Sequence, residues 1–460
     1  MNSSNSLKTP IAIIGAGLAG CECAMALAAN GIPSTLFEMK PHRYSPAHER
    51  DCLAELVCSN SLRSNDPKSA VGVLKNELRT LGSIVMRVAE ETAVPAGKAL
   101  AVDRELFGKR MTELVEAEPL ITLVRKEITS LDPALEPALA PFGTIVLSAG
   151  PVASDSISAS LAALLEPEGE QENSGKKNGS RLYFYDAIAP IVSGDSLNMD
   201  IIFRGSRYSE EEGDYLNCPM EKDEYFAFYE ALLSAEKAQT KDFEKEMHFE
   251  GCMPIEALAE RGPRTLSFGP FKPVGFTDPR TGRRPYAIVQ LRAENLNCTM
   301  FNLVGCQTKL LYKEQERIFR MIPGLENAEF VRFGSMHRNT FVNAPEVLAE
   351  DLSLRVAPHI FLAGQITGVE GYVESSACGL WLGLQLAARL NGRNIPQPPP
   401  ESGLGSLLRH LQTPVKRFQP SNVQYGLMPE LGERAKKADR KQLYSERATR
   451  SFDEWLPEIR

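Results

Sequence analysis

The chain has 460 residues, of which 43% are hydrophobic, enough for two or three domains with full cores. Its net charge of −8 argues against indiscriminate nucleic-acid binding but leaves room for a local basic surface. No apolar run reaches the length of a membrane span and residues 1–10 are polar, so we expect a cytoplasmic protein without anchor or signal peptide. The nine cysteines are scattered without CxxC pairs or histidines at ligand spacing, which argues for reduced thiols and against disulfides or a metal site.

The chain begins with the pattern of a dinucleotide-binding unit. Residues 11–14 are a short apolar run typical of a buried strand, and residues 18–30 are alanine-rich and predict a helix. A second strand-like run, at 33–37, ends on Glu38, about twenty residues after the first glycines. A dinucleotide fold needs a carboxylate at this place, because it accepts hydrogen bonds from ribose hydroxyls.

Three glycines in the turn have separate physical uses. Gly15 allows the sharp turn, Gly17 lets a pyrophosphate approach the backbone, and Gly20 lets the helix pack closely on the strand. The spacing predicts a dinucleotide site and leaves FAD and NAD as alternatives. We expect the cofactor to contact the whole turn: Gly15, Ala16, Gly17, Leu18, Ala19 and Gly20.

Residues 40–67 read as a polar loop beside this turn, and they contain Cys58. Its polar neighbours and Arg63 favour a partly exposed, reactive thiol. The alternative is that Cys58 is a small buried hydrophobe, as we expect for Cys21, Cys23 and Cys52.

The next hundred residues alternate helical and strand-like patterns. Residues 101–104 precede a helix that runs to 115, and strands are predicted at 121–124 and 144–147. The second of these closes on a Ser-Ala-Gly-Pro turn, so we expect it to end near the cofactor, with Ser154 capping the following helix. Residues 166–180 lack periodicity and predict an exposed loop.

From Arg181 the composition becomes aromatic-rich, which indicates a second domain. Within it, Cys252 stands between Gly251 and Met253-Pro254, so the backbone there predicts a turn that can present a thiol. Residues 261–292 then carry seven basic residues against one acid. This run predicts contact with RNA phosphates, with the alternative of a solvated face around core aromatics. The candidate RNA-binding residues are Arg261, Arg264, Lys272, Arg283 and Arg284, and the aromatics available for base stacking are Phe268, Phe271, Phe276 and Tyr286.

Strands at 287–291 and 299–304 and a helix around 314–321 are predicted next. His337 follows in a polar cluster between apolar runs. A single histidine is usually structural, but this one precedes the return to the first domain and is a candidate at the domain junction.

A second strand, glycine turn and helix begins about 345 residues after the first. The predicted strand 359–365 closes on Gly364 and Gln365, and an apolar helix is expected at 377–390. Two-domain flavoproteins close their FAD site with such a late helix N-terminus, which favours FAD over NAD. Its cofactor-binding candidates are Gly364, Gln365, Gly368, Gly371 and Tyr372. Residues 396–402 read as a proline-rich linker, and the tail after Arg409 as helical and basic.

Taken together, these stretches resemble the TrmFO family of folate- and FAD-dependent RNA uracil C5-methyltransferases. The resemblance runs from the glycine turn to the last helix. It is carried by LAELVCSNSLRS, YFYDAIAPIV, YLNCPM, FEGCMPIE, RPYAIVQLR, MHRNTF, GQITGVEGYVES and FQPSNVQYGL, in the family's order. The departures are Cys306 in place of an expected aromatic residue and longer insertions around 131–141 and 166–180.

The resemblance implies formation of 5-methyluridine at uracil-54 in the T-loop of tRNA. The one-carbon unit would come from 5,10-methylenetetrahydrofolate, with FADH2 as carrier and reductant and NADPH or NADH reducing the flavin. Uracil C5 is not nucleophilic, so a thiolate must first add to C6, and we expect Cys252 in this role. Cys58 is expected as the second catalytic thiol, and His337 as the residue that stacks on the folate.

The implied fold class is α/β: a Rossmann-like FAD-binding domain of the GR2 type with an inserted α+β domain. We expect the FAD-binding domain at 8–185 and 331–460, the second part with basic C-terminal helices, and the insertion, on the RNA and folate side, at 186–330. The expected partners are the T-arm of tRNA and small-molecule folate and nicotinamide substrates, without membrane or DNA. Two alternatives stay open: the same chemistry on a 23S ribosomal RNA uridine, and a flavin thiol oxidoreductase or FAD-binding RNA scaffold without methyl transfer. GidA-type flavoproteins share the glycine turn, but they are longer and fit the Cys252 and His337 motifs less well.

Overall fold

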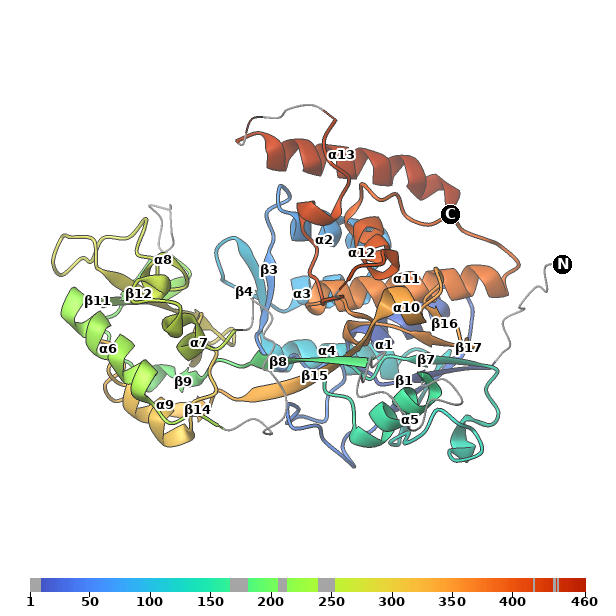
Figure 1. Cartoon of the computed structure of the whole chain (residues 1–460), viewed down its shortest axis with the longest axis horizontal. Coiled ribbons are helices and arrows are strands. Elements are labelled where there is room, and N and C mark those ends of the chain that lie inside the picture. The colour runs from blue at the N-terminus through green and yellow to red at the C-terminus, as the bar shows by residue number, and fades with distance from the viewer. Residues whose placement is uncertain are drawn as a thin grey trace.

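The computed structural model describes residues 10–165, 181–205, 213–238, 253–416, 418–432, 436 and 438–460, without the side chains of 181–186 and 337–338. Most of the buried apolar side chains among these residues belong to two large hydrophobic cores. The larger body is built around residues 11–165 and 341–459, and the smaller body around residues 192–328. Figure 1 shows the larger body on the right and the smaller body on the left.

A six-stranded sheet forms the centre of the larger body, in the order β16-β17-β7-β1-β2-β6. All neighbouring pairs are parallel except β16 with β17. Parallel strands are buried on both faces and therefore read as short continuous apolar runs, as β1 does. The strands are β1 Ile11–Ile14, β2 Ser34–Glu38, β6 Ile121–Arg125, β7 Thr144–Leu147, β16 Ser353–Leu354 and β17 Ala357–Leu362. A doubly wound parallel sheet with helices on its faces is the expected Rossmann-like architecture.

The helices of the larger body pack around this sheet and on one another. They are α1 Leu18–Ala29, α2 Ala70–Thr80, α3 Ile84–Glu91, α4 Arg104–Glu116, α5 Asp155–Leu165, α10 Ala344–Val347, α11 Tyr372–Leu390, α12 Gly403–Gln412 and α13 Arg440–Trp455. The closest pair is α1 with α11, where a Cβ added at Gly379 would lie 2.1 Å from the Ala19 carbonyl oxygen. Only glycine permits this approach, so the two glycine turns before these helices are held side by side.

A small antiparallel sheet and a two-stranded ribbon complete the larger body's side of the molecule. The sheet is made of β3 Ser61–Ser64, β5 Ala99–Val102 and β4 Ala93–Val94. The ribbon pairs β8 Arg181–Ala187 with β15 Met336–Val342, and in Figure 1 it runs between the two bodies. The chain therefore leaves for the smaller body and returns from it along adjacent strands.

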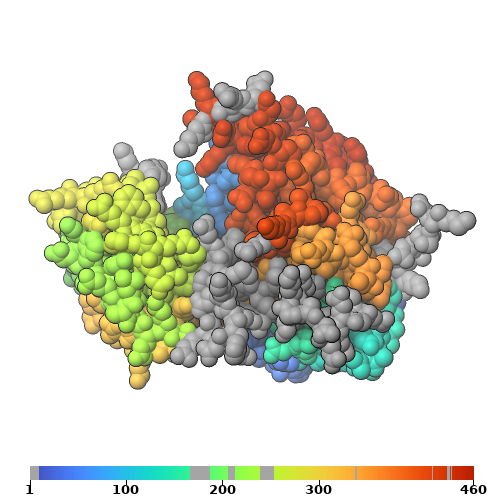
Figure 2. Space-filling view, in the orientation of Figure 1, coloured from blue at the N-terminus to red at the C-terminus, as the bar shows by residue number. Residues whose placement is uncertain are grey.

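The smaller body is a six-stranded antiparallel sheet, β10-β11-β12-β13-β9-β14, with helices packed against it. Its elements are β9 Ile191–Ser193, β10 Phe203–Arg204, β11 Tyr215–Met220, α6 Lys222–Ser234, α7 Ile255–Glu260, α8 Thr265–Phe268, β12 Ala287–Ala293, β13 Met300–Leu303, α9 Tyr312–Phe319 and β14 Phe330–Arg332. Figure 2 shows a notch between this body and the C-terminal helices of the larger one.

Several expected boundaries differ from the structure. The late helix begins at Tyr372 rather than at 377, because Gly371, with a φ of 114°, caps it directly. The polar loop 40–67 contains β3, and in the tail α12 starts at Gly403, before Arg409. The predicted loop 166–180 lies outside the described residues. Within the described ranges, no helix is long and apolar enough to cross a membrane.

Candidate functional site

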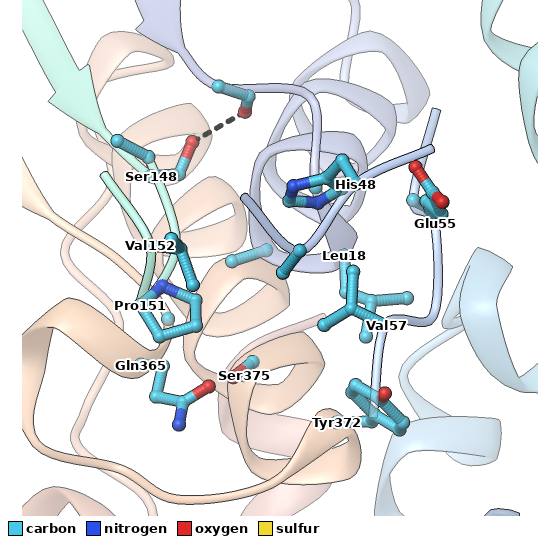
Figure 3. Close-up of a pocket in the computed structure, with 18 of the residues that line it drawn as sticks. Leu18, His48, Glu55, Val57, Ser148, Pro151, Val152, Gln365, Tyr372 and Ser375 are labelled. Carbon is cyan, nitrogen blue, oxygen red and sulfur yellow. Dashed lines mark hydrogen bonds between the residues drawn. The ribbon is translucent and has the colours of Figure 1, made fainter. Parts of the chain in front are cut away.

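A cavity of about 410 Å³ opens at the carboxyl ends of β1, β2 and β7. Cavities of this size suit small molecules and parts of cofactors, and in a doubly wound sheet they lie beyond the strand ends. Its wall combines the first glycine turn, the Cys58 segment, the loop after β7 and residues 363–375. In Figure 3, Ser148, Pro151 and Val152 lie on one side and His48, Glu55 and Val57 on the other, with Gln365, Ser375 and Tyr372 below.

In the first glycine turn, packing within the protein requires two of the glycines, whereas the third faces open space. Gly15 has a φ of 99°, and a Cβ there would lie 2.6 Å from the Ser148 carbonyl oxygen; one at Gly20 would lie 2.0 Å from that of Gly15. A Cβ on Gly17 meets nothing within 4 Å, although Gly17 lines the cavity. Packing within the protein does not require glycine at 17, whereas a pyrophosphate against the backbone would.

Glu38 lines the cavity at the end of β2 and is only 6% exposed. One carboxylate oxygen accepts a hydrogen bond from the Ala16 backbone N–H at 3.0 Å, and the other from that of Lys40 at 3.0 Å. Each oxygen has a second lone pair, so the carboxylate keeps acceptor capacity for hydroxyl groups. This geometry fits a ribose diol.

The second glycine turn forms the opposite part of the wall. Gly364, Gln365, Gly371 and Tyr372 line the cavity, and the Gln365 side chain is oriented by a 2.6 Å hydrogen bond to Glu370. Helices α1 and α11 both begin at the cavity, so their unpaired N–H groups and positive dipole ends suit an anionic ligand. These features together fit a dinucleotide.

Cys58 and Tyr372 form the most specific contact in the wall. The Tyr372 hydroxyl oxygen accepts hydrogen bonds from the backbone N–H groups of Cys58, at 2.8 Å, and Ser59, at 3.3 Å. It also lies 2.9 Å from Cys58 Sγ. Because two donors already point at the oxygen, the hydroxyl proton is left to point at the sulfur. Burial, together with Cys58, raises the pKa of Tyr372 well above its usual range, so the hydroxyl stays a donor.

Three arginines donate hydrogen bonds to the residues on either side of Cys58. Arg332 and Arg104 both donate to the Val57 carbonyl oxygen, at 3.0 and 3.4 Å. Arg292 donates to Ser59 Oγ at 2.7 Å and Asn60 Oδ1 at 2.8 Å. Burial lowers the pKa of Arg292 and of Arg332. The segment is therefore fixed by hydrogen bonds, with more positive charge beside the thiol than its own sequence indicates.

The remaining predicted site residues are placed as follows. Gly20 and Gly368 do not line the cavity, whereas Ala16, Leu18, Ala19 and Cys58 do. Cys252 and the His337 side chain lie outside what the structure describes, although the His337 backbone belongs to β15. In the smaller body, Arg261, Arg264, Arg283 and Arg284 are exposed and Lys272 is half-buried.

The expectation of four aromatics available for base stacking is wrong for two of them. Phe271 is fully buried in the core of the smaller body, and Phe276 is 6% exposed and lies 6.3 Å from Phe203, ring centre to ring centre. Tyr286 is half-buried and lies 5.1 Å from Tyr225, ring centre to ring centre. Phe268 alone of the four is well exposed, at 72%. Core packing, one of the two alternatives, thus accounts for most of these rings.

Sequence reasoning missed several cavity residues. His48 and Arg63 belong to the stretch read as a loop, Gln307 to a turn after β13, and Asn339 to β15. The only signal available was their place beside motifs: Arg63 follows Cys58, and Asn339 stands two positions after His337. Arg292 belonged to the basic run and was expected on a surface, but it is 7% exposed and lines the cavity.

Comparison with known proteins gives a consistent result. The family model described as Glucose inhibited division protein A matches residues 10–394. A protein of Nitratidesulfovibrio vulgaris (strain Hildenborough), named methylenetetrahydrofolate–tRNA-(uracil-5-)-methyltransferase TrmFO, is 66% identical over 460 residues, which cover 100% of this chain and 94% of that one. A protein of the same name from Oleidesulfovibrio alaskensis is 67% identical over 447 residues, 97% of each chain.

Among solved structures, GidA from Aquifex aeolicus superposes with a TM-score of 0.67 at 15% identity, covering 98% of this chain and 73% of that one. This likeness concerns the fold, and it agrees with a Rossmann-like body. The identity to the two curated relatives extends over nearly the whole length of both partners. The chain therefore belongs to the TrmFO family.

Proposed function

We propose that this protein transfers the one-carbon unit of 5,10-methylenetetrahydrofolate to C5 of uracil-54 in the T-loop of tRNA, and reduces it there to a methyl group. One observation carries the proposal: a thiol, Cys58, that lines a dinucleotide-type cavity in a chain of the TrmFO family. The names of the relatives state the folate donor and tRNA uracil C5.

FAD is the dinucleotide that the cavity is proposed to hold. The turn at 15–20 would take the pyrophosphate, Glu38 the ribose, and the start of α11 the flavin end. Bound FAD, reduced by NADPH or NADH, supplies the electrons that convert the transferred methylene group to methyl. The open space at Gly17 and the unused acceptor capacity of Glu38 support this assignment.

Cys252 is proposed as the nucleophile. Its thiolate adds to C6 of the uracil, which makes C5 an enolate carbon able to attack the methylene group. Removal of the C5 proton then lets the bond between the transferred carbon and its nitrogen carrier break, with the amine as leaving group, and the thiolate leaves C6 once the methylene group has been reduced to methyl. Support comes from the chain just after it: Ile255, the first residue of α7, donates its N–H to the Gln307 carbonyl oxygen at 2.6 Å, and Gln307 lines the cavity.

Cys58 is proposed as the base that takes the C5 proton. The Tyr372 hydroxyl donates to its sulfur, and such a hydrogen bond stabilises the thiolate form that a base needs. The buried arginines behind the segment act in the same direction, because their positive charge favours an anion nearby.

The folate and RNA sites are proposed on the side of the smaller body. His337 is a candidate for stacking on the folate, because its backbone belongs to β15, the strand whose Asn339 lines the cavity. The exposed Arg261, Arg264, Arg283 and Arg284, with Lys272, are proposed to contact tRNA phosphates. A loop uridine would have to leave its stack to reach the cavity.

The two bodies are proposed to be the two domains. The FAD-binding domain would comprise residues 8–185 and 331–460 and the insertion residues 186–330. The separate hydrophobic cores and the ribbon of β8 and β15 between them support this division.

The proposal is tested with holoenzyme, an unmodified tRNA transcript, NADPH and methylenetetrahydrofolate labelled in its one-carbon unit. Label in the tRNA is the expected result, with none when S-adenosylmethionine labelled in its methyl group replaces the folate. Label on 23S ribosomal RNA fragments but not on tRNA would change the target. No label on either RNA, with the flavin still reduced by NADPH, would leave a flavin oxidoreductase.

A further inference from the structure

Three aromatic rings of the smaller body are stacked in series. Tyr312, the first residue of α9, lies 4.7 Å from Phe333 with an interplanar angle of 16°. Phe333 in turn lies 5.2 Å from Phe330 at 10°. The Arg320 guanidinium is 6.0 Å from the centre of the Phe330 ring, at the inner end of the series. We call Tyr312, Phe333 and Phe330 the aromatic stack.

The outer end of the stack is on the surface. Tyr312 is 61% exposed, whereas Phe330 and Phe333 are half-buried. Burying an aromatic side chain is strongly favourable, so a large ring left at the end of an ordered stack is available for a ligand. In Figures 1 and 2, α9 and β14 lie at the lower left edge of the molecule.

Two hydrogen bonds keep the rings of the aromatic stack in place. The Gln315 side chain donates to the Gly334 carbonyl oxygen at 2.8 Å and accepts the Gly334 N–H at 2.7 Å. These bonds tie α9 to the residue that follows Phe333. A ligand that stacks on Tyr312 therefore meets a platform that is already ordered, and little entropy is lost on binding.

The aromatic stack is also connected to the cavity. Arg332, between Phe330 and Phe333 in sequence, donates to the Val57 carbonyl oxygen at 3.0 Å, and Val57 and Cys58 line the cavity. Gln307, another lining residue, precedes Tyr312 by five positions. The stack thus stands on the same structural unit as part of the cavity wall.

We propose that the aromatic stack is a platform on which an unpaired nucleobase of the RNA substrate, outside the reacting uridine, stacks upon Tyr312. This inference rests on the proposed function and adds a second contact to it. Two near-parallel ring pairs present a flat π surface, which suits a planar base and gives stacking that tolerates any sequence. On α9 the charges balance, with Lys313 and Arg317 against Glu314 and Glu316, so the contribution is stacking rather than phosphate binding.

The test compares tRNA affinity of the holoenzyme at two salt concentrations, using an unmodified transcript. Tyr312→Ala is expected to weaken binding roughly tenfold, about 1.4 kcal/mol, by the same factor at low and high salt. Tyr312→Phe keeps the ring and should retain wild-type affinity, while Tyr312→Leu keeps apolar area without a π face and should not. Leu135→Ala removes a 74% exposed side chain of the larger body and is the matched control, expected to have no effect.

A second readout locates the base. T-arm hairpins carrying 2-aminopurine at single loop positions should show fluorescence quenching at one position with wild type and with Tyr312→Phe, and not with Tyr312→Ala. Equal affinity and equal quenching in wild type and Tyr312→Ala would overturn the platform while leaving methyl transfer intact. Wild-type enzyme that neither binds nor methylates tRNA would overturn the proposed function, and the platform with it.

Discussion

Replacing Gly17 should weaken cofactor binding while leaving the stability of the fold almost unchanged. Gly17 has φ −74° and ψ −170°, which any residue can adopt, and a Cβ there meets no protein atom within 4 Å. In Gly17→Ala, losing a glycine stabilises the folded state by about 0.4–1 kcal/mol through the unfolded chain. Alanine at the N-cap costs a similar amount, so the free energy of unfolding without flavin should change by less than about 1 kcal/mol.

The same methyl group occupies the space that a pyrophosphate needs. FAD affinity should therefore fall at least tenfold, about 1.4 kcal/mol or more, in Gly17→Ala, and binding should be abolished in Gly17→Val. Gly20→Ala is the matched contrast, because its Cβ would lie 2.0 Å from the Gly15 carbonyl oxygen. It should lower the free energy of unfolding by about 1–3 kcal/mol or more even without flavin.

The assay is thermal and chemical unfolding of the flavin-free variants, followed by titration with FAD monitored by absorbance. A yellow, fully loaded Gly17→Val protein would refute the assignment of the turn. So would a Gly17→Ala protein that unfolds as easily as Gly20→Ala before any flavin is added.

Three further predictions concern the thiols and the buried carboxyls. Cys252→Ala should keep FAD bound yet lose covalent capture of an RNA containing 5-fluorouridine, whereas Cys58→Ala should still capture that RNA. Gel shifts under denaturing conditions distinguish the two variants. Capture by Cys252→Ala would reassign the nucleophile. Tyr372→Phe removes the hydroxyl that faces Cys58 Sγ, so alkylation of Cys58 by iodoacetamide should reach half its maximal rate at a higher pH than in wild type; an unchanged profile would remove the donor role. Burial raises the pKa of Glu22 and of Glu77 from 4.5 to about 7, so the folded state keeps protons that the unfolded chain releases. The stability they contribute is fully present below pH 4.5 and is lost as the pH rises through 7, by up to about 1.4 kcal/mol per pH unit and group. The double variant with glutamine at both positions should flatten this dependence in urea unfolding at pH 5 and 7; an equal slope in both proteins would contradict it.

Helices and strands whose signal lies in a few consecutive residues can be predicted from the sequence. The strand 11–14, the helix that follows it and the strand 144–147 agree with β1, α1 and β7 to within a residue. A strand buried on both faces and a helix begun by glycine each have a signal contained in a few consecutive positions. The second turn has the same kind of local signal, although its glycines predict a longer turn and α11 begins five residues before the predicted start at 377.

Contacts between distant residues could not be predicted from such patterns. Cys58 and Tyr372 are 314 positions apart, and Arg292 reaches Ser59 across 233 positions. Local composition also does not tell which face of a segment is inward, so Phe271 and Phe276 were expected at a surface and are buried. Both failures come from tertiary packing, which decides orientation after the local structure is set.

The measurement that tests the central claim most directly is methylation of two transcripts that differ at one base. Holoenzyme with labelled methylenetetrahydrofolate and NADPH should label an unmodified tRNA, with the label in 5-methyluridine at position 54. It should leave unlabelled the same tRNA with cytosine at that position. Equal label in both transcripts, or label in neither, would contradict the account.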